Sequence, residues 1–290
     1  MERYKEIERS IIKTYRAKLW APFIRALKEY ELILPGDKVC VCISGGKDSM
    51  LLAKLFQELK RHSDFDFDVE YLLMNPGYNE ENLNLIKENL KIMNIPAKII
   101  ETDIFSVANM QEKSPCYLCA KMRRGALYRL AKELGCNKIA LGHHYDDVIE
   151  TTLMNMLNAG SFQTMLPKLV SDNFPGMELI RPLYLIRERD ILAWKNYNQL
   201  KFILCACRFT EKTKAEDDPM KSGSQRLATK KLIHDLLEYN FNVEKNIFSA
   251  ASNVVLDKII GYKEEGVKHS FLETYKGRRL ENEDDKKSLK

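Results

Sequence analysis

The stretch that decides the fold is KVCVCISGGKDSMLL, residues 38–52. Its first six residues, Lys38–Ile43, form a short β-rich run that is typical of a buried strand. Ser44–Ser49 follows at once and opens a helical pattern of apolar residues. The sequence therefore predicts a strand, a turn with two glycines and a helix, in that order.

The turn has the composition of a phosphate-binding loop. Its glycines allow positive φ and let backbone amides approach an anion closely, and the helix start adds unpaired amides and a positive dipole end. Lys47 adds a mobile positive charge, and the two serines add hydroxyl donors. Asp48 is a poor neighbour for bare phosphate and therefore indicates a Mg²⁺ ligand. The loop consists of Ser44, Gly45, Gly46, Lys47, Asp48 and Ser49.

Strands and helices alternate outward from this loop. The alternation predicts an α/β fold with a doubly wound parallel sheet covered by helices on both faces. The ends of its strands would carry the binding site. The further strands are expected at Val69–Met74, Ala97–Glu101, Lys138–Leu141, Leu179–Leu183 and Phe202–Leu204. Further helices are expected between these strands. They are Leu83–Met93, Cys119–Leu134, a helix that follows Asp147 and runs through Leu157, and Glu188–Tyr197.

Composition excludes several classes of protein. The chain has 290 residues, 45% of them hydrophobic, and a net charge of +5, which is ordinary for a globular protein. No apolar run approaches the roughly 20 residues that cross a bilayer, and the charged N-terminus lacks a signal core. We therefore expect a cytoplasmic protein without a membrane partner.

Seven cysteines, an odd number without an export signal, argue against a disulfide framework. Cys116 and Cys119 have C-x-x-C spacing, which holds two thiolates around one metal or cluster. Cys205 and Cys207 follow another predicted strand and would lie at the same sheet edge. The sequence therefore predicts metal ligands at Cys116 and Cys119 and at one of Cys205 and Cys207, the alternative being a redox-active dithiol or buried thiols without a role. The remaining cysteines are expected in the core or without a role: Cys40, Cys42 and Cys136.

A second polar motif, Gly142–Asp147 (GHHYDD), ends another predicted strand. Gly142 and His143 are expected to orient the ligand of the phosphate-binding loop and the substrate. Asp146 or Asp147 would help to hold Mg²⁺, although one of them could equally cap the next helix. Arg181 ends a further short strand and is predicted to face the same site.

Basic residues suggest an RNA partner. Five basic residues and no acidic one lie between Cys116 and Lys132, close to the predicted metal site. Such side chains contact a phosphate backbone. The residues assigned to RNA are Lys121, Arg123, Arg124 and Arg129. Residues 2–30 carry eight basic and four acidic residues, a pattern typical of a solvated helix face or of a polyanion-binding surface.

The loop SGGKDS after a strand resembles the PP-loop of the adenine-nucleotide α-hydrolase group. This resemblance implies cleavage of ATP between its α and β phosphates, with the loop at the pyrophosphate and the adenine near Ile43 and Met74. The residues then expected to bind ATP are Ile43, Ser44, Gly45, Gly46, Lys47, Asp48, Ser49, Met74, Gly142, His143 and Arg181.

Four motifs together, SGGKDS, CYLCAKMRRGALY, KIALGHHYDD and IRPL, resemble the TtcA-like tRNA 2-thiocytidine synthetases. The resemblance runs from about Gly36 to Cys207 and weakly through Ser222–Val254. It implies ATP, Mg²⁺ and a [4Fe–4S] cluster held by three cysteines, whose fourth iron can carry a sulfide. The family's second C-x-x-C is here Cys205-Ala-Cys207, so either of these cysteines could be the third ligand.

The resemblance implies that the C2 oxygen of an anticodon-loop cytidine of tRNA is adenylated and then replaced by sulfur. It names Lys47, Asp48, Asp146 and Asp147 as catalytic, implies a sulfur donor and allows a homodimer. Three alternatives remain open at this point: 2-thiouridine formation, a PP-loop ligase for a small molecule, and a non-enzymatic iron–sulfur RNA-binding module.

Three regions are predicted. Residues 1–30 form a basic helical extension, residues 31–210 the PP-loop domain, and residues 211–290 a C-terminal extension. The last begins with an exposed loop over 211–224, continues with helices over Leu227–Tyr239 and Glu244–Ile260, and ends in a charged tail.

Overall fold

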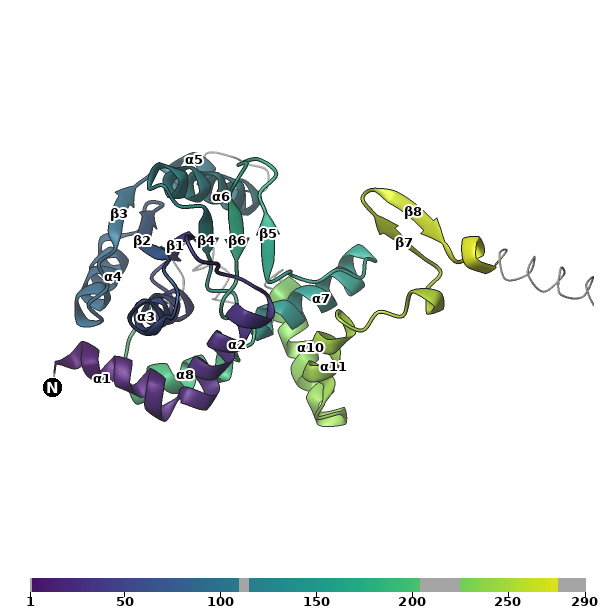
Figure 1. Cartoon of the computed structure of the whole chain (residues 1–290), viewed down its shortest axis with the longest axis horizontal. Helices are drawn as coiled ribbons and strands as arrows, with labels where there is room; N and C mark the ends of the chain where they lie inside the picture. The colour runs from purple at the N-terminus through teal and green to yellow at the C-terminus, as the bar shows by residue number, and fades with distance from the viewer. Residues whose placement is uncertain (1, 110–114, 204–224, 276–290) are drawn as a thin grey trace, which may run out of the picture.

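A six-stranded sheet forms the centre of the computed structural model, which describes residues 2–109, 115–203 and 225–275 (Figure 1). Five neighbouring strands are parallel, and the edge strand β5 is antiparallel to β6. The doubly wound, mostly parallel sheet expected from the sequence is thereby confirmed. The strands, in their order across the sheet, are β3 (Lys98–Glu101), β2 (Asp68–Asn75), β1 (Lys38–Ile43), β4 (Lys138–Ala140), β6 (Glu178–Ile180) and β5 (Lys168–Val170).

Helices cover both faces of the sheet because successive side chains of a strand point to opposite sides. Val39 and Val41 of β1 belong to a core shared with α3, α4 and α8, whereas Cys40 and Cys42 belong to a second core with α6. Figure 1 shows α5 and α6 on one side of the sheet and α3 on the other. The helices of these layers are α3 (Lys47–His62), α4 (Glu80–Ile92), α5 (Ile104–Asn109), α6 (Pro115–Glu133) and α8 (Glu188–Tyr197).

The N-terminal residues are helical and pack onto the α3 side of the sheet. Pro22 lies in the first turn of α2, where proline needs no amide partner. Ile7, Leu19 and Phe23 are fully buried in the same core as α3 and α8. This region consists of α1 (Arg3–Arg9), the π-helical stretches Ser10–Thr14 and Arg16–Trp20, and α2 (Ala21–Glu29). The boundary at residue 30 and the binding of a polyanion stay predictions.

The C-terminal elements lie beyond the carboxyl edge of the sheet. The helix α7 (Tyr145–Ala159) packs against α10 (Gln225–Tyr239) and α11 (Val243–Ala250). A 3₁₀ turn at Leu256–Lys258 leads to a hairpin that projects from the body (yellow in Figure 1). Its strands are β7 (Gly261–Glu264) and β8 (Val267–Ser270). Among the described helices, none is long and apolar enough to cross a membrane.

Two predictions about the C-terminal half are wrong. The helix expected over Glu244–Ile260 ends at Ala250, and a hairpin follows it. Its turn places Glu265 at φ 48° and Gly266 at φ 83°, the paired positive values that join two antiparallel strands. The strand expected over Phe202–Leu204 is absent at Phe202 and Ile203. There the carbonyl of Lys201 accepts from the Asn89 side chain at 2.7 Å instead of joining a ladder.

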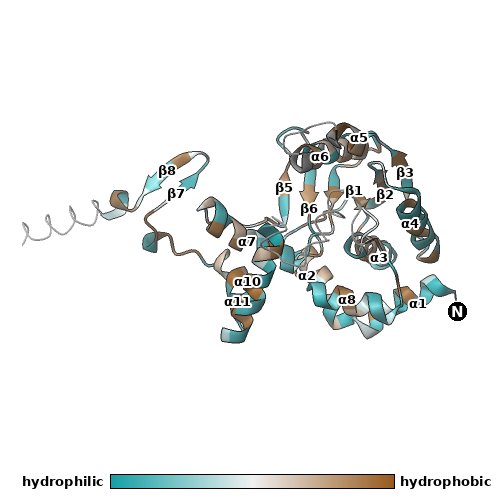
Figure 2. Cartoon of the chain, turned by 180° about the vertical axis from the view of Figure 1, so that it is seen from behind, coloured by the Kyte–Doolittle hydropathy of each residue, from teal (hydrophilic) through white to brown (hydrophobic). Residues whose placement is uncertain are grey.

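A third prediction needs a smaller correction. The helix expected from Cys119 begins at Pro115, so both cysteines of the C-x-x-C motif lie in its first turns rather than in a loop. Figure 2 shows hydrophobic residues recurring on the strands inside the body, as the burial of β1 and β4 requires. Leu204, the loop predicted over 211–224 and the tail over 276–290 lie outside the described residues.

Candidate active site at the carboxyl ends of β1 and β4

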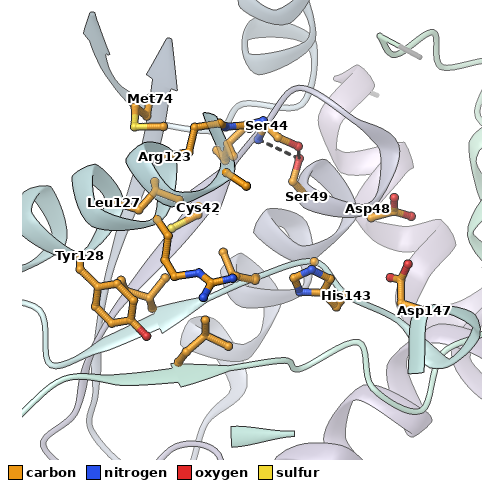
Figure 3. A pocket seen from close by; sticks show the side chains of 17 residues that line it. Cys42, Ser44, Asp48, Ser49, Met74, Arg123, Leu127, Tyr128, His143 and Asp147 are labelled. Carbon is orange, nitrogen blue, oxygen red and sulfur yellow. Dashed lines mark hydrogen bonds between the residues drawn. The ribbon is translucent and has the colours of Figure 1, made fainter. Parts of the chain in front are cut away.

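The strand order reverses between β1 and β4, because the chain passes from β1 to β2 and β3 on one side and from β4 to β6 on the other. Parallel sheets bind ligands at this point, outside the carboxyl ends of the strands. A cavity of about 440 Å³ lies there. Its polar end carries Asp48, His143 and Asp147, and Cys42 and Tyr128 lie toward its other end (Figure 3).

Hydrogen bonds within the loop after β1 fix its conformation. Gly45 has φ +81°, and the Ile86 side chain approaches it so closely that a Cβ would lie 2.5 Å from Ile86 Cγ1. The Ser49 hydroxyl donates to the Gly46 carbonyl at 3.0 Å and accepts from the Ser44 amide at 3.1 Å. No described side chain caps the start of α3 at Gly46. The first amides of α3 can therefore bind an anion.

The loop after β4 lies directly against this helix start. A Cβ on Gly142 would lie 3.1 Å from the Asp48 carbonyl carbon and from the Ser49 amide nitrogen. Only a residue without a side chain allows this approach at the present separation. As a result His143 and Asp147, from the β4–α7 segment, lie near Asp48 of α3 at the same end of the cavity (Figure 3).

Three buried polar atoms in this region have no hydrogen-bond partner among the described residues: Asp48 Oδ1, which His144 Nε2 approaches only to 3.9 Å, His143 Nδ1 and Arg181 Nε. Such atoms are costly to bury unless a ligand, ion or water satisfies them. Burial raises the pKa of Asp48 despite the attraction of His144 and Lys47. Burial also lowers the pKa of His143 to about 4, so its ring is neutral near pH 7. The donor set suits a polar ligand with a cation.

Lys47 lies between two carboxylates. Its ammonium is 3.1 Å from Asp48 Oδ2 and 3.0 Å from Glu188 Oε1. Burial lowers the pKa of Lys47, but the two carboxylates outweigh burial and raise it. Lys47 is therefore charged across the physiological range and stands beside the open helix start.

The two acidic residues of GHHYDD have different surroundings. Asp147 lines the cavity, and its Oδ2 accepts from the His144 amide at 2.9 Å in a capping box. Asp146 does not line the cavity. It binds Arg187 at 2.9 Å and accepts from the Glu188 amide at 2.6 Å, which ties α7 to the start of α8. This geometry gives Asp146 a structural place, and its catalytic role stays a prediction.

Helix α6 brings the cysteine motif to the cavity. Arg123 and Arg124 line it, as does Ala120, the residue after Cys119. Ser44 of the phosphate loop lines the same cavity, and its carbonyl accepts from the Tyr78 hydroxyl at 3.1 Å. The half-buried Cys119 therefore directly precedes a residue that shares a cavity with the phosphate loop.

The remaining proposed metal ligands cannot be placed. The side chain of Cys116 and the whole of Cys205 and Cys207 lie outside the described residues. Within the described part of the chain, no group of three His, Cys, Asp or Glu side chains could hold a metal ion.

Ten of the described residues that the sequence assigned to the site line the cavity: Ile43, Ser44, Asp48, Ser49, Met74, Arg123, Arg124, Gly142, His143 and Asp147. The described residues that do not line it are Gly45, Gly46, Lys47, Cys119, Lys121, Arg129, Asp146 and Arg181. Arg129 instead pairs with Glu133 on the exposed side of α6, at 3.3 Å. Arg181 donates to the Leu166 carbonyl.

Two parts of the site were not predicted from the sequence: the apolar part of the cavity and an acidic neighbour of the loop. Cys42, predicted only as a core residue, lines the cavity, because even-numbered positions of β1 face α6. The strand alternation already contained this signal. Glu188 contacts Lys47 from α8, 141 positions away, and no local pattern marks it. The other missed lining residues are Ala120, Leu127, Tyr128, Ile139, Leu141 and Leu179.

Comparison with known proteins agrees with this geometry. A family model described as the PP-loop domain matches residues 19–206. The tRNA-cytidine(32) 2-sulfurtransferase of Neisseria meningitidis serogroup C (strain 053442) is 37% identical over 241 residues, which span 79% of this chain and 70% of that protein. The protein of the same name from Citrifermentans bemidjiense is 33% identical, spanning 81% of this chain and 91% of that one.

A solved structure supports the fold independently. The U34-tRNA thiolase NcsA from Methanococcus maripaludis, with its [4Fe-4S] cluster, aligns with a TM-score of 0.62 over 84% of this chain and 80% of its own. Sequence identity is 22%, so this likeness concerns the fold alone. From the matched PP-loop domain and these relatives, the chain belongs to the PP-loop family and, within it, to the family of tRNA-cytidine(32) 2-sulfurtransferases.

Proposed function

We propose that the chain is an ATP-dependent tRNA sulfurtransferase that converts an anticodon-loop cytidine to 2-thiocytidine. One observation carries the proposal: the open amides of the SGGKDS loop, the unpartnered Asp48 Oδ1 and the C-x-x-C helix meet at one cavity. Membership of the family, whose curated relatives are named for this reaction, supports it.

The first chemical step is adenylation. The C2 oxygen of cytidine attacks the α-phosphorus of ATP, a new C2–O–P link forms, and the bond to the β-phosphate breaks to release pyrophosphate. The amides at the start of α3 bind the pyrophosphate part, and Lys47 neutralises charge as it develops. The second step is substitution: sulfide attacks C2, the C2–O bond breaks, and AMP leaves with the oxygen. No electrons are transferred overall.

A metal ion and an iron–sulfur cluster complete the proposal. Mg²⁺ would be held by Asp48, whose Oδ1 has no hydrogen-bond partner among the described residues, together with phosphate oxygens and water, and would neutralise phosphate charge. A [4Fe–4S] cluster would be held by Cys116, Cys119 and one of Cys205 and Cys207, and would supply sulfide when bound. The position of Cys119, one residue before the cavity lining, supports this assignment.

The RNA would approach over α6. Arg123 and Arg124 line the cavity mouth on the cysteine side, where they can bind the phosphates flanking an extruded base. Lys121 and Arg129 are exposed on the same helix and would contact more distant phosphates. The neutral His143 would bind the nucleotide or the base through its unpartnered Nδ1.

Three further parts complete the proposal. The sulfur donor is sulfide, either inorganic or derived from a cysteine desulfurase. The protein acts in the cytoplasm, and it can form a homodimer. The family resemblance supports all three.

Nucleoside mass spectrometry of tRNA from cells with and without the gene tests the proposal. The expected result is loss of 2-thiocytidine alone, restored by the wild-type gene. Loss of 2-thiouridine would instead assign a different base, and unchanged thionucleosides would reject a tRNA substrate. Cleavage of ATP to AMP and pyrophosphate on adding tRNA would exclude a purely binding module.

Changing the cluster ligand separates the two chemical steps. Cys116→Ala should abolish thiolation in the complemented strain while the purified protein still binds ATP–Mg²⁺, because the phosphate loop belongs to β1 and α3. Cys136→Ala is the matched control, since that buried thiol lies in the α6 core, and it should retain thiolation. Retained thiolation in Cys116→Ala would remove this cysteine from the cluster.

A further inference from the structure

Two successive ion pairs connect the C-terminal helix α10 to the phosphate loop. Glu188, the first residue of α8, accepts from Lys47 through Oε1 at 3.0 Å. Its other oxygen, Oε2, pairs with Lys230 of α10. The start of α8 is fixed as well, because the Glu188 amide donates to Asp146 at 2.6 Å. Glu188 is thus held from α7 and α10 while it contacts the loop lysine.

The carboxylate of Glu188 is ionised at every working pH. Burial raises its pKa, but Lys230 and Lys47 outweigh burial and lower the pKa to about 2. Its side chain is 21% exposed, so solvent screens the pair only partly. A fixed negative charge therefore always stands 3.0 Å from the Lys47 ammonium.

The contact has a consequence for Asp48. Lys47 also pairs with Asp48, but only through Oδ2; Oδ1 has no hydrogen-bond partner among the described residues, and His144 Nε2 lies 3.9 Å from it. A long lysine side chain has many rotamers, and an ammonium moves toward whichever carboxylate is nearest. Without Glu188, Asp48 would be the sole anionic partner of Lys47 in the described site. The Lys47 ammonium would then neutralise part of the Asp48 charge that is available to the proposed Mg²⁺.

We propose that Glu188, oriented by Lys230, is a positioning residue that holds Lys47 between its own carboxylate and Asp48 Oδ2, so that the ammonium stays off Asp48 Oδ1. Both residues lie outside the motifs that mark the family in the sequence. The inference deepens the proposed function, since it rests on nucleotide binding by this loop, but it does not depend on which base is modified.

The test measures the Kd of ATP by titration calorimetry, with Mg²⁺ and with EDTA. Glu188→Gln should weaken ATP–Mg²⁺ about tenfold, the scale of one charge-assisted contact, and weaken metal-free ATP less. Lys230→Met should act in the same direction with a smaller effect, and Lys230→Arg should bind as the wild type does. Equal affinities of Glu188→Gln and the wild type would overturn the proposal.

A matched carboxylate gives the control. Glu70 of β2 also contacts two lysines, Lys38 at 3.3 Å and Lys98 at 2.9 Å, with a similar exposed fraction of 23%. It lies toward the amino end of the sheet, away from the cavity. Glu70→Gln should leave the Kd unchanged in both conditions. A comparable loss in this variant would show that the effect is general and would contradict the proposal.

A charge reversal distinguishes positioning from mere stability. In Glu188→Lys combined with Lys230→Glu, the pair between α8 and α10 is restored, so the melting temperature should recover relative to Glu188→Lys alone. ATP–Mg²⁺ affinity should not recover, because a lysine at position 188 repels Lys47. Recovery of both would reduce Glu188 to a structural role. The quantities measured are the Kd of ATP and the melting temperature, not the formation of 2-thiocytidine. A wrong tRNA assignment would therefore leave these results intact.

Discussion

At the scale of single residues, the ionised Asp48 carboxylate lowers the stability of the fold while it serves the proposed function. Burial raises its pKa, so the folded chain binds a proton at this carboxyl more readily than the unfolded chain does. The protonated Asp48 carboxyl stabilises the fold at low pH. This stabilisation is lost as the pH rises through the raised pKa. At neutral pH the ionised, partly unpaired carboxylate therefore destabilises the fold.

Asp48→Asn should accordingly raise the melting temperature at pH 7.5 while abolishing Mg²⁺-dependent ATP binding. Calorimetric melting across a pH series checks this, and the gain should shrink as the pH is lowered. Asp66→Asn, at a carboxylate that is 97% exposed, serves as control and should change little. A lower melting temperature for Asp48→Asn at pH 7.5 would mean that its partners outweigh its burial.

What the sequence could predict at this scale depends on how local the cause is. Asp48 and Asp147 each follow, within a few residues, a glycine at the end of a strand, so their place follows from a short local motif. Glu188 has no such mark, because its contact with Lys47 exists only once α8 folds back onto α3. Arg226 similarly reaches Asp147 from α10 at 2.6 Å. Contacts between distant segments require the tertiary structure.

At the scale of elements, the site depends on the close contact of the β4–α7 loop with the start of α3. Gly142→Ala should destabilise the fold by about 1–3 kcal/mol, because its Cβ would press on backbone atoms at 3.1 Å that cannot rotate away. ATP affinity should fall with it, since Asp48 and His143 separate. Chemical denaturation and calorimetry on the same sample measure both effects.

The same substitution elsewhere supplies the comparison. Gly125 lies inside α6, and a Cβ there would meet no heavy atom within 4 Å. Gly125→Ala should be neutral or should stabilise the helix by roughly 0.5–1 kcal/mol. If the two alanine variants behaved alike, close packing at Gly142 would not be what positions the loop.

The helices and strands were predicted correctly where one hydrophobic period dominates a segment. They were predicted wrongly where patterns typical of a helix and of a strand compete. The strand β1 is flanked by glycine and the loop motif, so its bounds follow from composition. The segment after Ala250 is rich in Val, Leu and Ile, which suits a helix or a strand, and Gly266 decides the outcome by its positive φ. The edge strand β5 was not predicted, because its residues are half-buried or exposed and no buried apolar run marks it.

At the scale of the whole molecule, the two ends of the chain relate differently to the sheet. Phe23 of α2 is fully buried and meets Phe56 of α3 edge-on, with ring centroids 5.8 Å apart. Nearby, the buried Lys54 of α3 binds Glu8 of α1 at 2.6 Å and the Met93 carbonyl at 2.8 Å. The N-terminal helices therefore supply part of the core beneath the phosphate-binding helix. By contrast, Val267 in the C-terminal hairpin is 57% exposed.

Phe23→Ala should consequently cost about 3–5 kcal/mol, the range for removing a buried aromatic ring, and should lower the stability of the nucleotide-binding core itself. Val267→Ala should change stability by less than about 0.5 kcal/mol. Denaturant unfolding followed by tryptophan fluorescence reports on this core directly, because Trp194 of α8 is fully buried in it. A separate early transition in Phe23→Ala, with the main transition unmoved, would instead make residues 1–30 an independent extension. A single transition shifted as a whole would extend the nucleotide-binding unit to the N-terminus, with α1 and α2 supporting the helix from which Lys47 and Asp48 meet the phosphates.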